Sequence, residues 1–166
     1  SAIVEKPDDP PTDLANVGCY AFEPDIFEYL AQTARSERGE YEITDTLELL
    51  LGDGRDISVV EYDGRWLDVG RPWELLRANE LLLEDIDRDI QGAVAEGAQV
   101  DGDVIVEAGA TVQDSVHIEG PAVILSGAEV GPNAYIRGAT TVGADVHVGH
   151  SVEVKNSILM RDTAVP

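Results

Sequence analysis

The sequence predicts a fold in two parts, a mixed α/β segment over residues 1–87 and an all-β solenoid over residues 88–166. Two observations predict this division. In the first part, segments with apolar residues at helical spacing are interspersed with short segments in which apolar and polar residues alternate. Pro and Gly residues separate these segments. In the second part, an aliphatic residue recurs every six positions, a period that fits neither an α-helix nor an amphipathic strand.

The six-residue repeat is regular enough to fix the architecture of the second part. Its leading position is Val or Ile at Val94, Val100, Val106, Val112, Ile118, Ile124, Val130, Ile136, Val142, Val148 and Val154. A small or β-branched residue follows four positions later each time, up to Ile158. Three hexads then form a triangular coil, and coils stack at the strand spacing of about 4.8 Å. We expect the leading side chains inside, and glycines such as Gly127 and Gly131 at corners that need a positive φ.

The first 87 residues predict alternating strands and helices. Strands are expected at residues 3–5 and 16–22, and a hairpin is expected over residues 57–62 and 65–69, turning at Asp63-Gly64. Helices are expected to begin after Glu23-Pro24, to be capped by Thr44, and to begin at Pro72 and run to about Asp87.

The charge balance excludes some partners. The chain has 33 acidic and 11 basic residues and a formal net charge of -22, which repels nucleic acid and anionic membranes. Because the acids are spread along the chain, we interpret them as the solvated surface of a salt-adapted protein from a halophilic archaeon. The single Cys19 cannot form an internal disulfide. No apolar run is long enough to span a bilayer, and residues 1–7 do not form a signal peptide, so we expect a soluble cytoplasmic protein.

Four short motifs occur in order in the first part. They are Val4-Glu5-Lys6-Pro7, Asn16-Val17-Gly18-Cys19-Tyr20-Ala21-Phe22, Glu42-Ile43-Thr44-Asp45 and Trp66-Leu67-Asp68-Val69-Gly70-Arg71-Pro72. Together they resemble the successive C-terminal motifs of sugar-1-phosphate nucleotidyltransferases, the glucose-1-phosphate thymidylyl- and uridylyltransferases. The resemblance implies that residues 1–87 are the C-terminal portion of a Rossmann-like nucleotidyltransferase domain.

The resemblance also implies roles for individual residues. The reaction joins a sugar phosphate to the α-phosphorus of a nucleoside triphosphate such as UTP or dTTP, so negative charge must be held by a divalent cation and a basic side chain. By resemblance, Lys6 contacts the sugar phosphate and Glu5 accepts hydrogen bonds from sugar hydroxyls. Asn16 and Gly18 line the sugar pocket, and Asp68 is a Mg²⁺ ligand, a hard oxygen donor for a hard cation.

Arg137 and Lys155 form a second candidate site, in the solenoid. They are 18 residues apart, so they stack in adjacent coils, and two stacked cations repel each other unless an anion lies between them. Glu119 and Asp101 continue the same column, so a ladder of surface salt bridges is the alternative interpretation.

Residues 131–138 and 148–156 resemble the acetyltransferase half of bifunctional N-acetylglucosamine-1-phosphate uridylyltransferase/glucosamine-1-phosphate acetyltransferases. That resemblance implies a left-handed β-helix, a homotrimer, phosphosugar contacts from Arg137 and Lys155, and acetyl-CoA as a possible second substrate. The catalytic histidine of that family would fall immediately after Pro166. We expect His117 and His147 at exposed corners and His150 on the surface, without a catalytic or metal-binding role.

The glycine-rich loop and the second metal-binding aspartate with which nucleotidyltransferases begin have no match here. We therefore expect a fragment of a longer enzyme, which contains no catalytic residue and is inactive alone. Two alternatives stay open, a hexapeptide-repeat acyltransferase only and a non-catalytic assembly or regulatory subunit.

Overall fold

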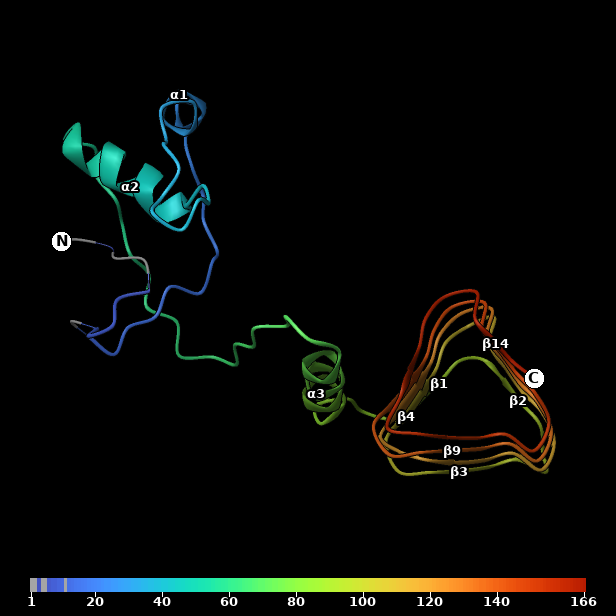
Figure 1. Ribbon diagram of the computed structural model, residues 1–166. Coiled ribbons are helices and arrows are strands. Elements are labelled where there is room, and N and C mark those ends of the chain that lie inside the picture. Colours follow the sequence, from blue (N-terminus) through green and yellow to red (C-terminus); the bar gives the residue numbers. More distant parts are fainter. Residues whose placement is uncertain (1–2, 4–5, 11) are drawn as a thin grey trace. The chain divides into compact units, whose positions relative to one another are not determined.

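The computed structural model describes residues 3, 6–10 and 12–166. The chain forms two compact units, Ser1–Trp66 and Leu67–Pro166, each with its own packing. The first unit contains α1 (Ile26–Leu30) and α2 (Ile43–Gly52), and the second contains α3 (Pro72–Leu83) and every strand (Figure 1). Within the described ranges, no helix is long and apolar enough to cross a membrane.

The first unit is built on two short helices with a small apolar core. Ile26, Leu47 and Leu50 are buried together where α1 meets α2. The buried hydroxyls of Thr33 and Thr46 hydrogen-bond each other at 2.7 Å, which satisfies both polar groups inside this contact. The apolar spacing therefore correctly predicted both helices. The predicted cap was wrong, because α2 begins after Glu42 and Thr44 is a buried residue inside the helix.

The strands expected in the first 87 residues are not formed among the residues that the structure describes, and residues 4 and 5 of the first one lie outside them. Segments 16–22, 57–62 and 65–69 pair with no neighbouring strand. At the expected hairpin turn, the Tyr62 hydroxyl instead donates to the Arg65 carbonyl at 3.2 Å. A strand needs a partner for its backbone N–H and C=O groups, and here Val59 and Val60 stay 79% and 88% exposed. The strand predictions were wrong because alternation alone supplies no partner.

The second unit is a parallel β-solenoid with a triangular cross-section, consistent with the predicted left-handed β-helix (Figure 1). Three sheets form its sides, in the orders β1-β4-β7-β10-β13, β14-β11-β8-β5-β2 and β12-β9-β6-β3. The strands are β1 (Asp89–Ile90), β2 (Ala93–Val94), β3 (Gln99–Asp101), β4 (Val104–Val106), β5 (Thr111–Val112), β6 (His117–Glu119), β7 (Ala122–Ile124), β8 (Glu129–Val130), β9 (Tyr135–Arg137), β10 (Thr140–Val142), β11 (His147–Val148), β12 (Glu153–Lys155), β13 (Ile158–Leu159) and β14 (Ala164–Val165).

The interior of the solenoid is filled as the repeat predicts. The leading residues Val112, Val130 and Ile136 are almost completely buried, and so are the small residues four positions later, such as Ala128. Because each coil adds one Val or Ile per side, the core is a stack of aliphatic layers. Burial of apolar surface in these layers stabilises the fold by roughly 25 cal/mol per Å².

The repeat shortens by one residue in the last coil. Ile158 lies opposite Thr141 and Leu159 opposite Val142, a spacing of 17. A strict period of six predicts that Ile158 lies opposite the buried residue Thr140, 18 positions earlier. This prediction was wrong, because Ile158 lies opposite Thr141. The corner at residues 156–157 is one residue shorter than the corner at residues 138–140.

Glycine serves two different purposes at the corners. Gly127 has the predicted positive φ, 76°. Gly131 does not, and comparable corners instead place Asn133 and Asp145 in the left-handed region at φ 57° and 58°. Gly131 is needed because a Cβ there would lie 2.8 Å from the Val148 carbonyl oxygen of the next coil. For Gly131 the prediction of positive φ was therefore wrong, and close approach of neighbouring coils is the reason for glycine.

Helix α3 packs on the outside of the solenoid. Pro72 occupies its first turn as predicted. The Asn79 amide donates to the Ala139 carbonyl at 3.0 Å and accepts from the Thr141 hydroxyl at 2.6 Å. Since the amide nitrogen and the amide oxygen of Asn79 are both hydrogen-bonded to β10 and the corner before it, Asn79 fixes the position of the helix along the coils.

We predict that Gly131→Ala destabilises the solenoid by about 1–3 kcal/mol, because the added methyl group overpacks against backbone that cannot move independently. Urea unfolding followed by circular dichroism measures the change. Gly70→Ala is the matched control in the same unit, since its nearest atom, Glu74 Oε2, lies at an ordinary 3.7 Å. Equal stabilities for the two variants would contradict the close-approach explanation.

Candidate functional site

The loop with Asn16 and Gly18 is a compact turn. The Gly18 N–H donates to Asn16 Oδ1 at 2.9 Å, and Gly18 has a φ of 77° with open space where a side chain would be. The indole N–H of Trp66 donates to the Val17 carbonyl at 3.1 Å and ties a second motif to this loop. Two predicted substrate residues are thus brought together, on a backbone that leaves room for a ligand to approach.

The other predicted residues of this group are Lys6, Glu5 and Asp68. Lys6 is exposed and has a φ of 40°. Glu5 lies outside the described residues. Asp68 belongs to the second unit, in the exposed segment just before α3, where the Gly70 N–H donates to Glu74 Oε2 at 2.9 Å.

The magnesium site expected at Asp68 would be of one particular kind. The part of the chain that the structure describes holds no cluster of three or more His, Cys, Asp or Glu side chains suited to a metal ion. Mg²⁺ in nucleotide enzymes is bound through one or two carboxylates, with waters and substrate phosphates completing its shell. A single exposed carboxylate such as Asp68 is compatible with that arrangement and not with a cage made only of protein ligands.

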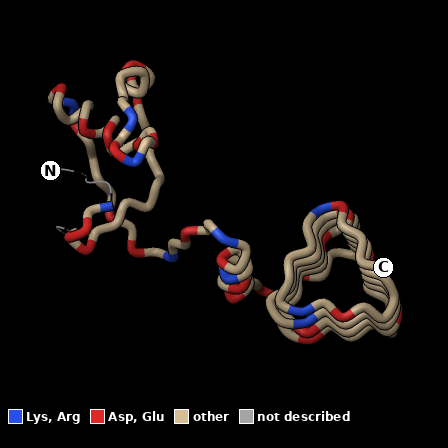
Figure 2. The backbone as a smooth tube through the Cα atoms, viewed as in Figure 1, with Lys and Arg blue, Asp and Glu red and all other residues tan. Residues whose placement is uncertain are grey.

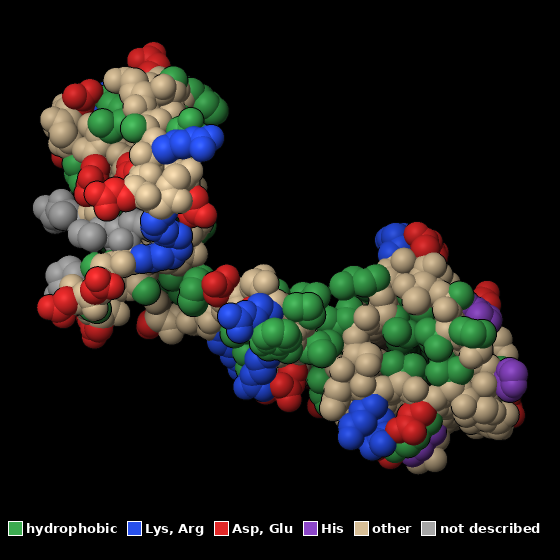
Figure 3. Space-filling model, viewed as in Figure 1, with side chains coloured by type: hydrophobic (Ala, Val, Ile, Leu, Met, Phe, Trp, Pro, Cys, Tyr) green, Lys and Arg blue, Asp and Glu red, His purple; other side chains and the backbone are tan. Residues whose placement is uncertain are grey.

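The outward face of the sheet β3–β6–β9–β12 carries the second candidate site. Its strands align Asp101, Glu119, Arg137 and Lys155 in one column, as the spacing of 18 predicts. Figure 2 shows basic residues of successive coils side by side at one corner of the triangle. In the space-filling view, basic, acidic and histidine side chains gather at this edge of the solenoid (Figure 3).

Within this column, Arg137 does not form the simple salt-bridge ladder with Glu119. Its Nε donates to Glu153 Oε1 at 2.7 Å, and its Nη2 lies 2.6 Å from the same oxygen. The guanidinium carbon lies 5.3 Å from the Tyr135 ring centroid. The hydrogen bond to Glu153 raises the pKa of Arg137 further above its ordinary value. Among the described residues, Lys155 has no ion-pair partner, although the chain has a formal net charge of -22. One cation of the stacked pair is therefore neutralised and the other is available.

A neighbouring column on the same face contains an aromatic stack that sequence reasoning missed. The rings of His117 and Tyr135 are 5.1 Å apart and nearly parallel, at 11°. His117 Nε2 lies 3.0 Å from Asp101 Oδ2, and this hydrogen bond lowers the pKa of Asp101. The hydrogen bond with Glu119 raises the pKa of Tyr135. The signal was present, because residues 117, 135 and 153 are also 18 apart.

The expected positions of two histidines were wrong. His117 lies in β6 and His147 in β11, not at corners. His117 is half-buried under Tyr135, since its side chain is 34% exposed, while His147 and His150 are exposed as expected.

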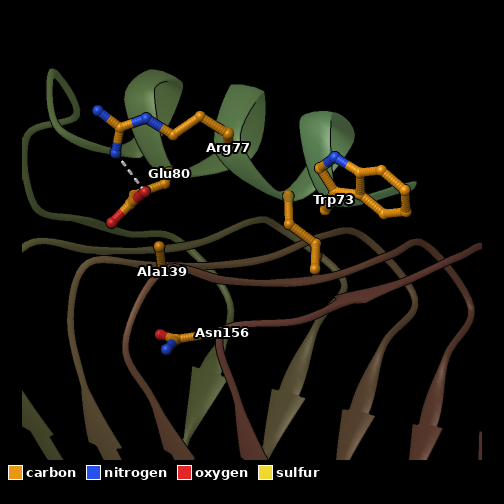
Figure 4. Close-up of a pocket in the computed structure, with 6 residues that line it drawn as sticks. Trp73, Arg77, Glu80, Ala139 and Asn156 are labelled. Atoms are coloured by element: carbon orange, nitrogen blue, oxygen red, sulfur yellow. Dashed lines mark hydrogen bonds and ion pairs between the residues drawn. The ribbon is translucent and has the colours of Figure 1, made fainter. Parts of the chain in front are cut away.

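A shallow groove runs between α3 and the solenoid corners (Figure 4). It has a volume of about 220 Å³, below the range of roughly 300–1,000 Å³ typical of ligand pockets. Trp73, Leu76, Arg77, Glu80, Ala139 and Asn156 line it, and Arg77 and Glu80 form an ion pair across part of its rim. None of the predicted substrate residues lines this groove, so it does not outline the expected site.

The sequence profile of the Nucleotidyl transferase family matches residues 1–85, which is half of the chain, and the chain belongs to this family. Two relatives that align along nearly the entire chain are bifunctional proteins. The "Bifunctional protein GlmU" of Methanocaldococcus jannaschii is 46% identical over 99% of this chain and 40% of its own length. The "Bifunctional sugar-1-phosphate nucleotidylyltransferase/acetyltransferase" of Sulfurisphaera tokodaii is 40% identical over 100% of this chain and 41% of its own length.

A further relative aligns over a shorter segment. The "Low-salt glycan biosynthesis nucleotidyltransferase Agl11" of Haloferax volcanii is 46% identical over 60% of this chain and 28% of its own length. The chain therefore spans about two fifths of the length of the bifunctional relatives that it matches end to end.

We predict that the pKa of the Asp101 carboxyl group lies below the ordinary aspartate value of about 3.9. Hydrogen bonds with His117, the larger cause, and with Gln99 stabilise its charged form. His117→Phe keeps a ring on Tyr135 and should raise this pKa towards the ordinary value. Since the folded-state pKa is lowered, the associated stabilisation is present above the unfolded-state pKa and is lost as pH falls through the folded-state value.

Carbon-13 NMR titration of the aspartate carboxyl groups measures this shift directly. His147→Phe, on a different sheet, should leave the pKa of Asp101 unchanged. An Asp101 pKa that is equal in the His117→Phe variant and the parent protein would show that the hydrogen bond is not its cause.

Proposed function

We propose that this chain is part of a sugar-1-phosphate nucleotidyltransferase, which transfers a nucleotidyl group from UTP or dTTP to a hexose 1-phosphate and releases pyrophosphate. The observation that carries the proposal is the order of the four motifs within the segment that the family profile matches. The alignment of bifunctional relatives along the entire chain supports it further. We place the boundary between the nucleotidyltransferase domain and the β-helix at residues 87 and 88, because the family match ends at 85 and β1 begins at Asp89.

In this reaction the residues of the first motif group hold the sugar phosphate. Lys6 offers a compact positive charge to the phosphate, and Glu5 accepts hydrogen bonds from sugar hydroxyls. The turn at Asn16 and Gly18 lines the sugar pocket, with no side chain at Gly18 to block a ring. Asp68 would hold Mg²⁺, which neutralises the phosphate charge that develops in phosphoryl transfer.

The solenoid supplies a second proposed activity, acetylation of glucosamine 1-phosphate with acetyl-CoA. Arg137 and Lys155 contact the phosphosugar there. The available charge of Lys155, stacked on Arg137 in an otherwise acidic chain, supports an anion as their shared ligand. A homotrimer formed through the β-helix is the assembly that we propose, in the cytoplasm where nucleoside triphosphates are made.

The full-length natural protein should release pyrophosphate from one pair of nucleoside triphosphate and sugar 1-phosphate in the presence of Mg²⁺ and molar KCl. Asp68→Ala should abolish this turnover, because the carboxylate that binds the cation is lost. Asp63→Ala removes an equal charge outside the four motifs and should retain activity. Pyrophosphate release, coupled to phosphate detection, measures each case.

Failure of every substrate pair with a folded protein would contradict the nucleotidyltransferase proposal. The hexapeptide acyltransferase and the assembly subunit would then be the remaining functions.

Salt adaptation is a further part of the proposal, supported by the net charge of -22 and by the resemblance to a Haloferax volcanii protein. Self-repulsion of such a charge destabilises a compact state unless salt screens it, and the screening length falls to about 3 Å at 1 M. We expect the unfolding midpoint to rise steadily from dilute buffer to molar KCl. Full stability in dilute buffer would refute salt adaptation.

A further inference from the structure

Glu153 pairs with Arg137. The Nε–H of the guanidinium, one of its five N–H groups, donates to Glu153 Oε1, and Nη2 lies 2.6 Å from the same oxygen. The remaining N–H groups are left for other acceptors. Glu153 and Lys155 lie on one strand, β12, with Lys155 directly opposite Arg137.

Tyr135 holds the same guanidinium from a second side. Its ring lies 5.3 Å from the Arg137 guanidinium carbon, within the range of a cation–π contact. The ring is fixed in turn by stacking on His117. A flexible arginine is thus confined by a carboxylate from the next coil and by an aromatic ring of its own strand.

The ion pair contributes little to stability by itself. The side chains of Arg137 and Glu153 are 36% and 52% exposed, and exposed pairs of this kind are typically worth about 0–1 kcal/mol. Its main physical consequence is a restricted rotamer. A guanidinium already held in place loses less conformational entropy when a ligand binds.

We propose that Glu153 is a positioning residue for the phosphosugar site formed by Arg137 and Lys155. This inference rests on the phosphosugar site proposed above. Glu153 holds the Arg137 guanidinium from strand β12, and Lys155 on the same strand lies opposite Arg137 and adds the second positive charge. The phosphate then meets a guanidinium that is already held in place.

The opposite role, in which Glu153 only competes with the anion for Arg137, predicts a different result from mutation. Glu153→Gln and Glu153→Ala remove the same negative charge, but only glutamine keeps a side-chain oxygen that accepts from Arg137. Competition predicts that both variants bind phosphate equally well or that alanine binds more tightly. Positioning predicts that alanine binds more weakly than glutamine.

The test is isothermal titration of the full-length protein with glucose 1-phosphate, and with inorganic phosphate in parallel. The solenoid site is identified as the binding component that Lys155→Ala removes. We expect Glu153→Ala to weaken this component about tenfold relative to Glu153→Gln, which corresponds to about 1.4 kcal/mol. Glu153→Gln should bind at least as tightly as the parent protein, since it keeps a side-chain oxygen that accepts from Arg137 and lacks the negative charge that competes with phosphate.

Glu129→Ala and Glu129→Gln form the control pair, because Glu129 is a similarly exposed carboxylate on another sheet. They should not differ from each other. Equal or tighter binding by Glu153→Ala than by Glu153→Gln would overturn the positioning role. A parent protein without any binding that depends on Lys155 would overturn both this role and the phosphosugar site, and pyrophosphate release tests the nucleotidyl reaction separately.

Discussion

The spacing between hydrogen-bonded parallel strands is the constraint on which the second unit depends. Each coil lies about 4.8 Å from the next, so whatever occupies a position on one coil must fit against the residue above it. Inside, this distance selects one Val or Ile per layer, as at Val112 and Val130. Outside, it brings side chains together regardless of their charge, and this is how the two cations Arg137 and Lys155 come to be neighbours.

This constraint explains why the solenoid could be predicted so fully from the sequence. A period of six fixes the side of the triangle, the buried register and the column that each outward residue joins. The diagonal contact between Arg137 and Glu153 could not be predicted in the same way, because it depends on how a long side chain bends across columns. The stack of His117 and Tyr135 follows from the same spacing of 18, which the sequence prediction applied only to the column of Asp101, Glu119, Arg137 and Lys155.

The first unit shows what local patterns do not specify. Helices satisfy their own backbone hydrogen bonds, so the spacing of Ile26, Leu47 and Leu50 was enough to place them. A strand is completed by a partner far away in the chain, and the alternation around Val59 and Val60 carried no information about one. The motif at Asn16 and Gly18 is intermediate, because its turn is held by hydrogen bonds only two residues apart.

The shortened corner at residues 156–157 has a consequence for how such solenoids change during evolution. In an ordinary sheet, loss of one residue within a strand turns every following side chain to the opposite face. Here the corner absorbs the loss, so Leu159 still lies opposite Val142 and Val165 still lies opposite Val148. Corners therefore uncouple chain length from side-chain direction. Insertions and deletions can accumulate there, and coils of unequal length can be combined, while the aliphatic interior continues without interruption.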